Sequence, residues 1–348
     1  MTGPSPAADS AAAAASDASQ SHGFEPAGFE TATTERLLAS ETAEASPDFE
    51  PQRRARALVE ALPHIQRFSG SVVVVKYGGS AMTDPALAAS FARDMVLVNA
   101  VGLRAVVVHG GGPQIGEQLA RMGRQSEFRD GLRVTDAETL EVVRMVLVGK
   151  IGRDIVGAVG AGGGAAVGLS GEDAGLVKVV PRDPALGFVG DITAVDPTII
   201  EQLLVEGTVP VVAPIGADTS GQAYNINADT MAAALAGALG AAKVVYLTDV
   251  AGLLADVSDA SSLLGRATAS DVEAMIASGA LSGGMIPKAR ACVDALSRGV
   301  GSAHILDGRI PHCVLLELFT DAGIGTMITR QDGPGPAHGQ GTGQGASA

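Results

Sequence analysis

Two lysines lie beside glycine-rich segments, at positions where a positive charge is unfavourable without an anionic partner. Lys76 ends the apolar run 72–76 (VVVVK), and Lys288 ends the segment 283–288 (GGMIPK). An unpaired lysine is costly at the end of a buried strand, and the helix dipole disfavours a cation in the first turn of a helix. A bound anion removes both penalties, so the pair predicts a phosphate site with Lys76 and Lys288 as catalytic cations facing one cleft.

Three glycine-rich junctions could cradle that anion. They are KYGGS at 76–80, HGGGP at 109–113 and GGMIPK at 283–288. Consecutive glycines without a Cβ atom let backbone N–H groups approach an anion closely, and a helix N-terminus adds partial positive charge. Each junction alone is more simply a tight turn between a strand and a helix. The two lysines are what favour the phosphate site.

Two further segments carry polar side chains in suitable places. GLRVTD at 131–136 holds Arg133 between apolar residues, which suits two-pronged binding of a carboxylate, although a surface ion pair is the plain alternative. TDVAG at 248–252 follows another apolar run, where it either lines a nucleotide pocket or forms an ordinary turn.

The segment YNINAD at 224–229 alternates amides with a carboxylate at the expected start of a helix. Asn227 is placed to cap that helix, and Asp229 falls in its first turn. Capping alone would explain the pattern. The functional interpretation has Asn225 binding substrate and Asp229 orienting the two lysines.

Other well-known signatures are missing. In HGGGPQIG at 109–116, Ile115 stands where the third glycine of a dinucleotide fingerprint belongs, which disfavours a Rossmann oxidoreductase. Lys150 is followed by Ile151, so GK at 149–150 does not end a P-loop. No histidine pair has metal-ligand spacing, so we expect no metal site in the chain itself.

Composition agrees with an α/β enzyme that binds small molecules. The 348 residues include 46 glycines and 46% hydrophobic residues, but no tryptophan and only 3% aromatic residues. The net charge of −14 argues against nucleic acid as a partner. No apolar run approaches the roughly 18 residues that a membrane span needs, and no base precedes Arg36, so we expect a cytoplasmic protein. Cys292 and Cys313 are expected to be small core residues rather than a disulfide.

The pattern along the chain predicts alternating strands and helices. Apolar runs typical of buried parallel strands lie at 72–76, 104–109, 165–169, 176–180, 209–214, 243–248 and 302–306. Helical spacing lies at 85–101, from 113 onward, and at 137–148, 197–206, 229–239, 269–278 and 286–298. This alternation predicts a mainly parallel sheet with helices on both faces and ligands beyond the carboxyl ends of its strands.

The two ends of the chain differ from this core. Residues 1–50, rich in Ala, Ser and acids, contain nine acidic residues and one basic one, and are expected to be disordered, as is the tail 331–348. Apolar residues at helical spacing predict an amphipathic helix at 51–68, which either packs on its own domain or serves as an oligomerisation arm. The Gly/Ala-rich stretch 156–166 is expected to loosen a connection between a helix and a strand.

Taken together and in this order, the motifs resemble the amino acid kinase family. The matching segments are VVVVKYGGSAM, VVVHGGGPQI, GLRVTD, VGLSGEDAG, YNINADTMA, VVYLTDVAG and LSGGMIPK, spread over about residues 51–330. GLRVTD and YNINAD resemble the branch that acts on N-acetyl-L-glutamate. The resemblance implies a three-layer αβα sandwich, with an N-lobe at 69–242 for acetylglutamate and a C-lobe at 243–330 for ATP with Mg²⁺.

The resemblance also implies a role for each matching residue. The reaction would phosphorylate the γ-carboxylate of N-acetyl-L-glutamate in arginine biosynthesis. The implied catalytic residues are Lys76, Lys288 and Asp229, and the implied substrate contacts are Gly111, Gly112, Arg133 and Asn225. The implied nucleotide and phosphate contacts are Gly78, Gly79, Thr248, Asp249, Gly252, Gly284 and Met285.

Both ends of the core resemble the arginine-inhibited, hexameric branch of the family. That likeness implies an L-arginine site with His304, Glu317 and Gly323, and a homohexamer interlaced through the 51–68 helix. Capping of a sheet edge is the plain alternative for the three residues. Rival functions are a kinase of glutamate, aspartate, carbamate or UMP, and a catalytically silent arginine-binding subunit. Docking of a nitrogen-signalling protein on the ring is left open.

Overall fold

The computed structural model describes residues 50–281, 283–321 and 323–330. The chain divides into the units Met1–Arg54 and Ala55–Ala348, and the second contains the fold described below. Apart from Glu50, the segments predicted to be disordered, 1–50 and 331–348, lie outside the described residues.

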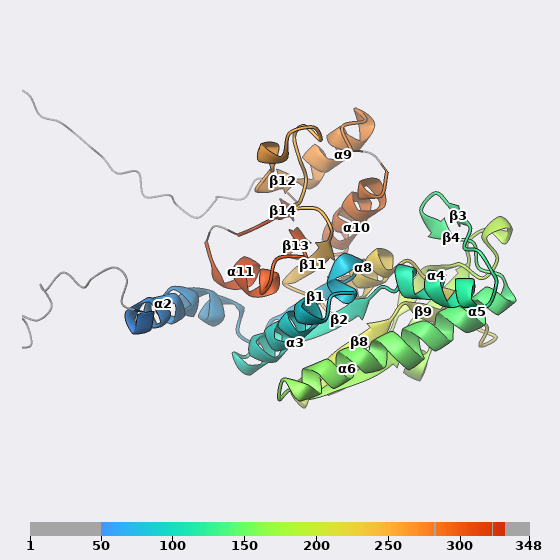
Figure 1. Cartoon of the computed structure of the whole chain (residues 1–348), viewed down its shortest axis with the longest axis horizontal. Helices are drawn as coiled ribbons and strands as arrows, with labels where there is room; N and C mark the ends of the chain where they lie inside the picture. Colours follow the sequence, from blue (N-terminus) through green and yellow to red (C-terminus); the bar gives the residue numbers. More distant parts are fainter. Residues whose placement is uncertain (1–49, 282, 322, 331–348) are drawn as a thin grey trace, which may run out of the picture. The chain divides into compact units, whose positions relative to one another are not determined.

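An eight-stranded sheet forms the centre of the second unit (Figure 1). Its order is β12-β14-β13-β11-β1-β2-β8-β5, and every neighbouring pair is parallel except β13 and β14. The strands are β1 (Val72–Tyr77), β2 (Arg104–His109), β5 (Ala166–Ser170), β8 (Val209–Ala213), β11 (Lys243–Thr248), β12 (Arg266–Thr268), β13 (Ser302–Asp307) and β14 (Thr326–Thr329). The predicted mainly parallel sheet is confirmed.

Helices cover both faces of this sheet, as the sequence predicts. Val73 and Val75 of β1 point into one hydrophobic core, and Val74 points into the other, because successive strand residues face opposite sides. The first core includes α3 (Pro85–Ala100), α4 (Gly112–Arg121), α5 (Ala137–Arg144), α6 (Gly152–Ala161) and α11 (Cys313–Phe319). The second includes α7 (Thr198–Val205), α8 (Ala228–Ala238), α9 (Ala269–Ala277) and α10 (Met285–Ser297). The result is the three-layer αβα sandwich.

One long helical stretch corrects a sequence prediction. The helix expected at 137–148 continues through a π-helical segment, η3 (Met145–Ile151), into α6. The prediction of a loosened connection at 156–166 was therefore wrong for its first half, since residues 156–161 are helical. Glycine in a helix costs about 1 kcal/mol relative to alanine. Burial of Ile155 and Val159 against the sheet offsets that cost.

Short elements account for most of what the sequence pattern missed. A four-stranded sheet has the order β10-β9-β6-β7 and comprises β6 (Val177–Pro181), β7 (Gly190–Val195), β9 (Ile215–Ala217) and β10 (Ala223–Asn225). Of these, only β6 was predicted. A hairpin joins β3 (Phe128–Arg129) to β4 (Leu132–Arg133), and single 3₁₀ turns lie at Gly79–Met82, Asp173–Gly175, Pro184–Leu186 and Ala260–Ser262.

The predicted amphipathic helix is present as α2 (Glu50–Phe68) and begins one residue earlier than expected. Cys292 and Cys313 are buried and free, which confirms their prediction as core residues. Within the described ranges, no helix is both long and apolar enough to cross a membrane.

Candidate active site

The two predicted catalytic lysines meet at one carboxylate. Lys76 lies near the carboxyl end of β1, Asp229 lies in the first turn of α8, and Lys288 lies near the start of α10. Lys288 Nζ donates a hydrogen bond of 3.0 Å to Asp229 Oδ2. Lys76 Nζ lies 3.0 Å from Oδ1, in a contact with the geometry of an ion pair rather than a hydrogen bond. The expected position of Asp229 between the two lysines is confirmed.

Burial and charge oppose each other in this triad. Only 9% of Lys76 and 8% of Asp229 are exposed. Burial lowers the pKa of the Lys76 ammonium, and the negative charge of Asp229 partly restores it. Burial alone would raise the pKa of Asp229, but the charges of Lys76 and Lys288 outweigh it and lower the pKa to about 2. Within the triad two cations share one carboxylate, and the charge of Asp249 also acts on Lys76. Each ammonium has three hydrogens, so both lysines keep donors for a further anion.

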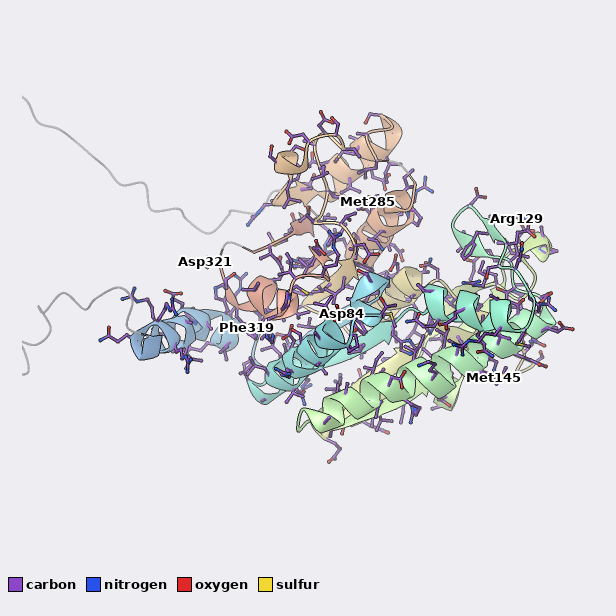
Figure 2. All side chains as sticks on the ribbon, viewed as in Figure 1. Asp84, Arg129, Met145, Met285, Phe319 and Asp321 are labelled. Carbon is purple, nitrogen blue, oxygen red and sulfur yellow. The ribbon has the colours of Figure 1, made fainter. Side chains whose placement is uncertain are left out.

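Both lysines line one cavity of about 430 Å³, referred to below as the large cavity. Its walls come from the carboxyl ends of β1 and β11 and from the start of α10, where Figure 2 labels Met285. Among the predicted nucleotide contacts it includes Gly79, Thr248, Asp249, Gly252, Gly284 and Met285. Gly78 is outside this lining, although a Cβ built on it would meet Lys76 Nζ.

Gly78 and Gly79 in the first junction leave no room for a side chain. Asp249 Oδ1 accepts hydrogen bonds of 2.7 Å from both Ser80 N and Ser80 Oγ, which draws the loop onto the end of β11. Gly79 has φ +74°, and a Cβ there would lie 2.6 Å from Asp249 Oδ1. A Cβ at Gly78 would lie 2.5 Å from Lys76 Nζ. Side chains at these positions would displace the groups that shape the large cavity.

A second cavity, the small cavity of about 150 Å³, contains the predicted substrate contacts. Gly111, Gly112, Arg133 and Asn225 all line it. Asn227 and Ala228 line it too, and the next residue, Asp229, holds the lysines of the large cavity. The first turn of α8 therefore connects the two cavities. Asn227 caps that helix by accepting hydrogen bonds from the backbone N–H groups of residues 229 and 230, as predicted.

Arg133 is the principal cation of the small cavity. It is 7% exposed, and its guanidinium donates to Gly112 O at 2.9 Å and to Ser126 Oγ. The guanidinium also lies over the ring of Phe128, 4.6 Å from its centre. Asn225 Nδ2 donates to Thr135 Oγ1 at 3.3 Å. These contacts hold the hairpin over the cavity and fix the direction of the arginine fork.

Two contributors to the glycine loop at 109–112 were missed from the sequence. His109 is fully buried, and its Nδ1 lies 3.0 Å from Gly110 O, so this nitrogen carries the proton and donates it to the loop. Burial lowers the pKa of His109 to about 4, which keeps the ring neutral. A Cβ at Gly111 would lie within 2.6 Å of side-chain atoms of Leu147 and Ile151 in the π-helical segment. A π-helix leaves no apolar periodicity in a single sequence, so its contribution could not be predicted. His109, in contrast, belongs to the HGGGP segment and could have been recognised.

The predicted effector residues form a separate buried cluster. His304 Nδ1 lies 2.6 Å from Glu317 Oε1, and Glu317 Oε2 accepts a 2.9 Å hydrogen bond from Ile324 N. Gly323 has φ +59°, and a Cβ there would lie 3.0 Å from Glu317 Oε2. Lys243, which was not predicted, lies 3.3 Å from His304 Nε2 and over the ring of Phe68.

The described part of the chain contains no group of three or more His, Cys, Asp or Glu side chains placed to hold a metal ion.

Comparisons with known proteins agree with this geometry. Residues 71–307 match the Amino acid kinase family. An acetylglutamate kinase of Pelotomaculum thermopropionicum is 51% identical over 292 residues, covering 80% of this chain and 99% of that protein. A chloroplastic acetylglutamate kinase of Arabidopsis thaliana is 51% identical over 286 residues, covering 82% of this chain and 81% of that protein.

Solved structures share the fold of this chain. An N-acetylglutamate synthase from Neisseria gonorrhoeae, complexed with coenzyme A and N-acetyl-glutamate, superposes with a TM-score of 0.71 at 25% identity. The match covers 80% of this chain and 63% of the synthase, so this chain spans less than two thirds of that protein. A carbamate kinase from Giardia lamblia bound to AMP-PNP, with a TM-score of 0.56, 18% identity and coverage of 76% and 100%, shares the fold.

Proposed function

The chain belongs to the amino acid kinase family, and we propose that it transfers the γ-phosphoryl group of ATP to the γ-carboxylate of N-acetyl-L-glutamate. The product would be an acyl phosphate used in arginine biosynthesis. The observation that carries this proposal is the Lys76–Asp229–Lys288 triad, placed where two cavities adjoin. Relatives named acetylglutamate kinase, about half identical to this chain, support the choice of substrate.

The chemistry needs positioning and charge more than proton transfer. A carboxylate is already a nucleophile, so no general base is required. The barrier then depends on in-line alignment and on neutralising the charge of the transferred group. Lys76 and Lys288 supply that charge, and Asp229 holds both ammonium groups in place. MgATP enters as co-substrate and brings its metal with it.

Each cavity suits one substrate. The large cavity, about 430 Å³ and lined by apolar residues beside both lysines, accommodates the nucleotide. The small cavity, about 150 Å³, accommodates the acetylated amino acid, with Arg133 forking its α-carboxylate and Asn225 holding its acetyl amide. Backbone N–H groups of Gly79 and Gly111 then meet the phosphoryl group from either side.

An acyl-phosphate assay tests the proposal directly. Purified chain, MgATP and hydroxylamine should yield hydroxamate with N-acetyl-L-glutamate and little with L-glutamate, aspartate or carbamate. Because UDP is not an acyl phosphate, UMP is tested by the release of ADP, which should be small. Equal or greater turnover of another acceptor would assign the chain to a different member of the family. Absence of turnover with every acceptor would favour a silent arginine-binding subunit.

Replacing Asp229 with asparagine should shift the pH dependence of kcat/KM. The variant loses the charge that raises the pKa of Lys76, while burial and the charge of Lys288 continue to lower it. A lysine with a lower pKa loses its proton at a lower pH, and the neutral amine no longer stabilises the phosphoryl group. The alkaline limb of the profile should therefore move to lower pH, together with an overall loss of rate.

The matched control is Asp191→Asn, which removes one partner of the exposed Arg182–Asp191 ion pair. Its pH profile should superimpose on that of the parent chain. An alkaline limb that stays in place or moves to higher pH in Asp229→Asn would contradict the assigned role.

We further propose that the buried cluster around Glu317 binds L-arginine as a feedback inhibitor. The carboxylate of Glu317 can accept two parallel hydrogen bonds from the guanidinium of L-arginine. Gly323, which has no Cβ, allows its loop to approach that carboxylate closely. Lys243 lies near His304 and also over the ring of Phe68, so it links the end of α2 to the same cluster. On binding, the guanidinium of L-arginine would replace His304 as the partner of Glu317.

Glu317→Gln should raise the arginine concentration for half-inhibition by about tenfold or more, since a charged hydrogen bond contributes about 1.5–3 kcal/mol. Inhibition is measured relative to the uninhibited rate of each variant, with Glu273→Gln on the exposed side of α9 as control. Unchanged inhibition in Glu317→Gln would mean that L-arginine binds elsewhere. A parent chain whose activity does not change with L-arginine would refute the proposed feedback inhibition.

The proposed assembly is a homohexamer held by α2, which exposes 73% of Leu58 and 47% of Leu62. Leu58→Glu with Leu62→Glu should reduce the sedimentation coefficient of the assembly. Val205→Glu is the matched control, since Val205 is also 73% exposed and lies outside α2. A parent chain that sediments as a dimer or monomer would refute the hexamer. The cytoplasmic location and the docking of a nitrogen-signalling protein stay predictions.

A further inference from the structure

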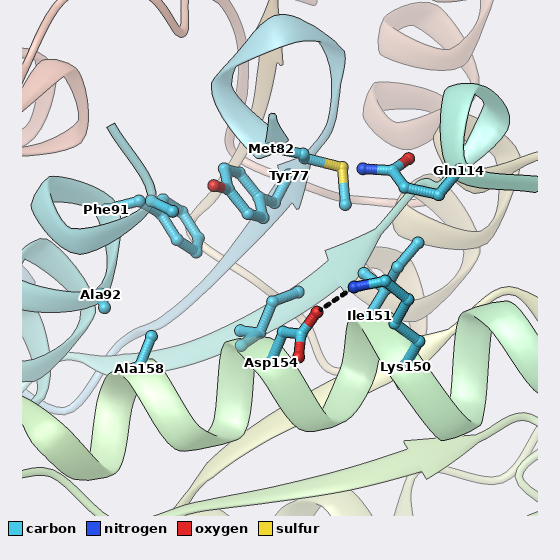
Figure 3. A pocket seen from close by; sticks show the side chains of 11 residues that line it. Tyr77, Met82, Phe91, Ala92, Gln114, Lys150, Ile151, Asp154 and Ala158 are labelled. Carbon is cyan, nitrogen blue, oxygen red and sulfur yellow. Dashed lines mark hydrogen bonds and ion pairs between the residues drawn. The ribbon is translucent and has the colours of Figure 1, made fainter. Parts of the chain in front are cut away.

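His109 is a fully buried polar side chain that has no part in the proposed reaction so far. It ends β2 and lies beside Tyr77 of β1 in the register of the sheet. Tyr77 and Ile151 line a neighbouring cavity of about 110 Å³ (Figure 3), but His109 lines neither that cavity nor the two cavities of the candidate active site. A Cβ built on Gly152 would lie 3.5 Å from His109 Nε2, so the imidazole packs against the start of α6.

The two ring nitrogens of His109 differ in their partners. Burial lowers the pKa of His109 to about 4, so the ring is neutral at pH 7 and carries one proton. Nδ1 lies 3.0 Å from Gly110 O, and because a carbonyl oxygen can only accept, that proton belongs on Nδ1. Nε2 is then an acceptor, and it is buried without a hydrogen-bond partner among the described residues. A buried acceptor without a partner opposes folding, so the hydrogen bond from Nδ1 is what a histidine offers here over an apolar residue.

That hydrogen bond fixes the direction of one peptide group in the glycine loop. A peptide group is planar and trans, so the C=O of Gly110 and the N–H of Gly111 point to opposite sides. Because the oxygen is turned toward the imidazole, the Gly111 N–H is directed away from it. This N–H donates no hydrogen bond to any of the described residues, and Gly111 lines the small cavity. Two glycines restrict the rotation of this peptide only weakly, so its direction depends on the imidazole.

We propose that His109 is a positioning residue, which turns the Gly111 N–H toward the phosphoryl group as it passes from ATP to the acceptor carboxylate. This role rests on the proposed kinase function. A backbone N–H directed at the place where negative charge develops stabilises the transition state, provided that its direction is fixed beforehand. The imidazole fixes that direction from behind the loop, without contacting a substrate.

The variants His109→Asn and His109→Leu form a matched pair for the test. Their side chains have the same branching, but only the amide of His109→Asn can take the place of Nδ1–H and donate to Gly110 O. Loss of a whole oxyanion donor typically lowers kcat about a hundredfold or more, so His109→Leu should lower kcat roughly tenfold or more and His109→Asn only about threefold. The KM for ATP should stay unchanged in both variants. Steady-state kinetics with N-acetyl-L-glutamate measure these effects.

Thermal unfolding separates positioning from packing. His109→Leu should unfold at a temperature at least as high as His109→Asn, because leucine buries no unpaired amide oxygen. A role in packing alone would make the more stable variant the more active one. Val159→Ala is the control for general destabilisation, since Val159 is a fully buried residue of α6 outside the three cavities. It should lower the unfolding temperature and leave kcat close to that of the parent chain.

Nitrogen-15 NMR of the imidazole tests the hydrogen bond without any turnover. In the parent chain labelled at its six histidines, the signals that disappear in His109→Asn should show a proton on Nδ1 and none on Nε2. A proton on Nε2 would overturn the proposal, and so would a kcat of His109→Asn equal to or below that of His109→Leu. A parent chain without turnover would refute the proposed function and this role with it, whereas the NMR result would still decide the hydrogen bond.

Discussion

Lys288→Met is expected to lower kcat about a thousandfold while the chain stays folded, and Lys76→Met is expected to do the same. An ammonium about 4 Å from a phosphoryl oxygen contributes roughly 4 kcal/mol at an effective dielectric constant near 20, and each 1.36 kcal/mol is about tenfold in rate. Burial already disfavours the charged form of Lys76, and in Lys76→Met the ammonium of Lys288 still neutralises Asp229, so the loss of Lys76 should cost little stability. Steady-state kinetics with saturating ATP and acetylglutamate, beside thermal unfolding, measure both effects.

Lys178→Met is the matched control, because Lys178 is an exposed lysine outside all the cavities described above. Near-normal kcat in either Lys76→Met or Lys288→Met would refute their assignment as catalytic cations. A loss of kcat accompanied by a large fall in unfolding temperature would instead mean that the lysine stabilises the fold by neutralising Asp229.

Arg133→Lys is expected to raise the KM for acetylglutamate by roughly tenfold to a hundredfold and to leave the KM for ATP nearly unchanged. Lysine retains the charge but cannot bind Gly112 O, Ser126 Oγ and a substrate carboxylate with one rigid fork. Each lost hydrogen bond to a charged group costs about 1.5–3 kcal/mol, and about 1.4 kcal/mol corresponds to a factor of ten in affinity.

The neighbouring hairpin residue provides the control. Arg129 belongs to the same hairpin but is outside the lining of the small cavity, and its ion pair with Glu127 is half exposed. Arg129→Lys should therefore leave both KM values close to those of the parent chain. A rise in the ATP KM of Arg133→Lys equal to that for acetylglutamate would mean that Arg133 shapes the whole cleft rather than one substrate site.

The long elements could be predicted because their local pattern and their burial agree. The apolar run at 72–76 and the run at 243–248 became β1 and β11 within one residue, since both faces of a central parallel strand are covered by helices. Two- and three-residue strands such as β3 and β9 are too short to show any periodicity, even though β4 and β10, with which they pair, follow closely in the chain.

Some functional groups were also visible in the chain. Lys76 and Lys288 were conspicuous because each stands where an unpaired charge is costly, and Asn227 was recognisable as a helix cap. Lys243 gave no such signal, because a lysine at the start of a strand is ordinary. Its proximity to His304 and Phe68 exists only once β11 and β13 pair and α2 reaches the sheet.

The sequence by itself determined that Lys76 and Lys288 are anomalous cations beside glycine loops, and that Asp229 begins a helix. Only the tertiary structure decided that all three meet. Lys76 and Asp229 are 153 positions apart, and their contact depends on the strand order β11-β1-β2 and on the packing of α8 and α10 behind it. Local patterns report backbone preference and burial. Which buried charges share a partner is set by how the sheet is ordered, because parallel strands bring their carboxyl ends to one edge regardless of their separation in the chain.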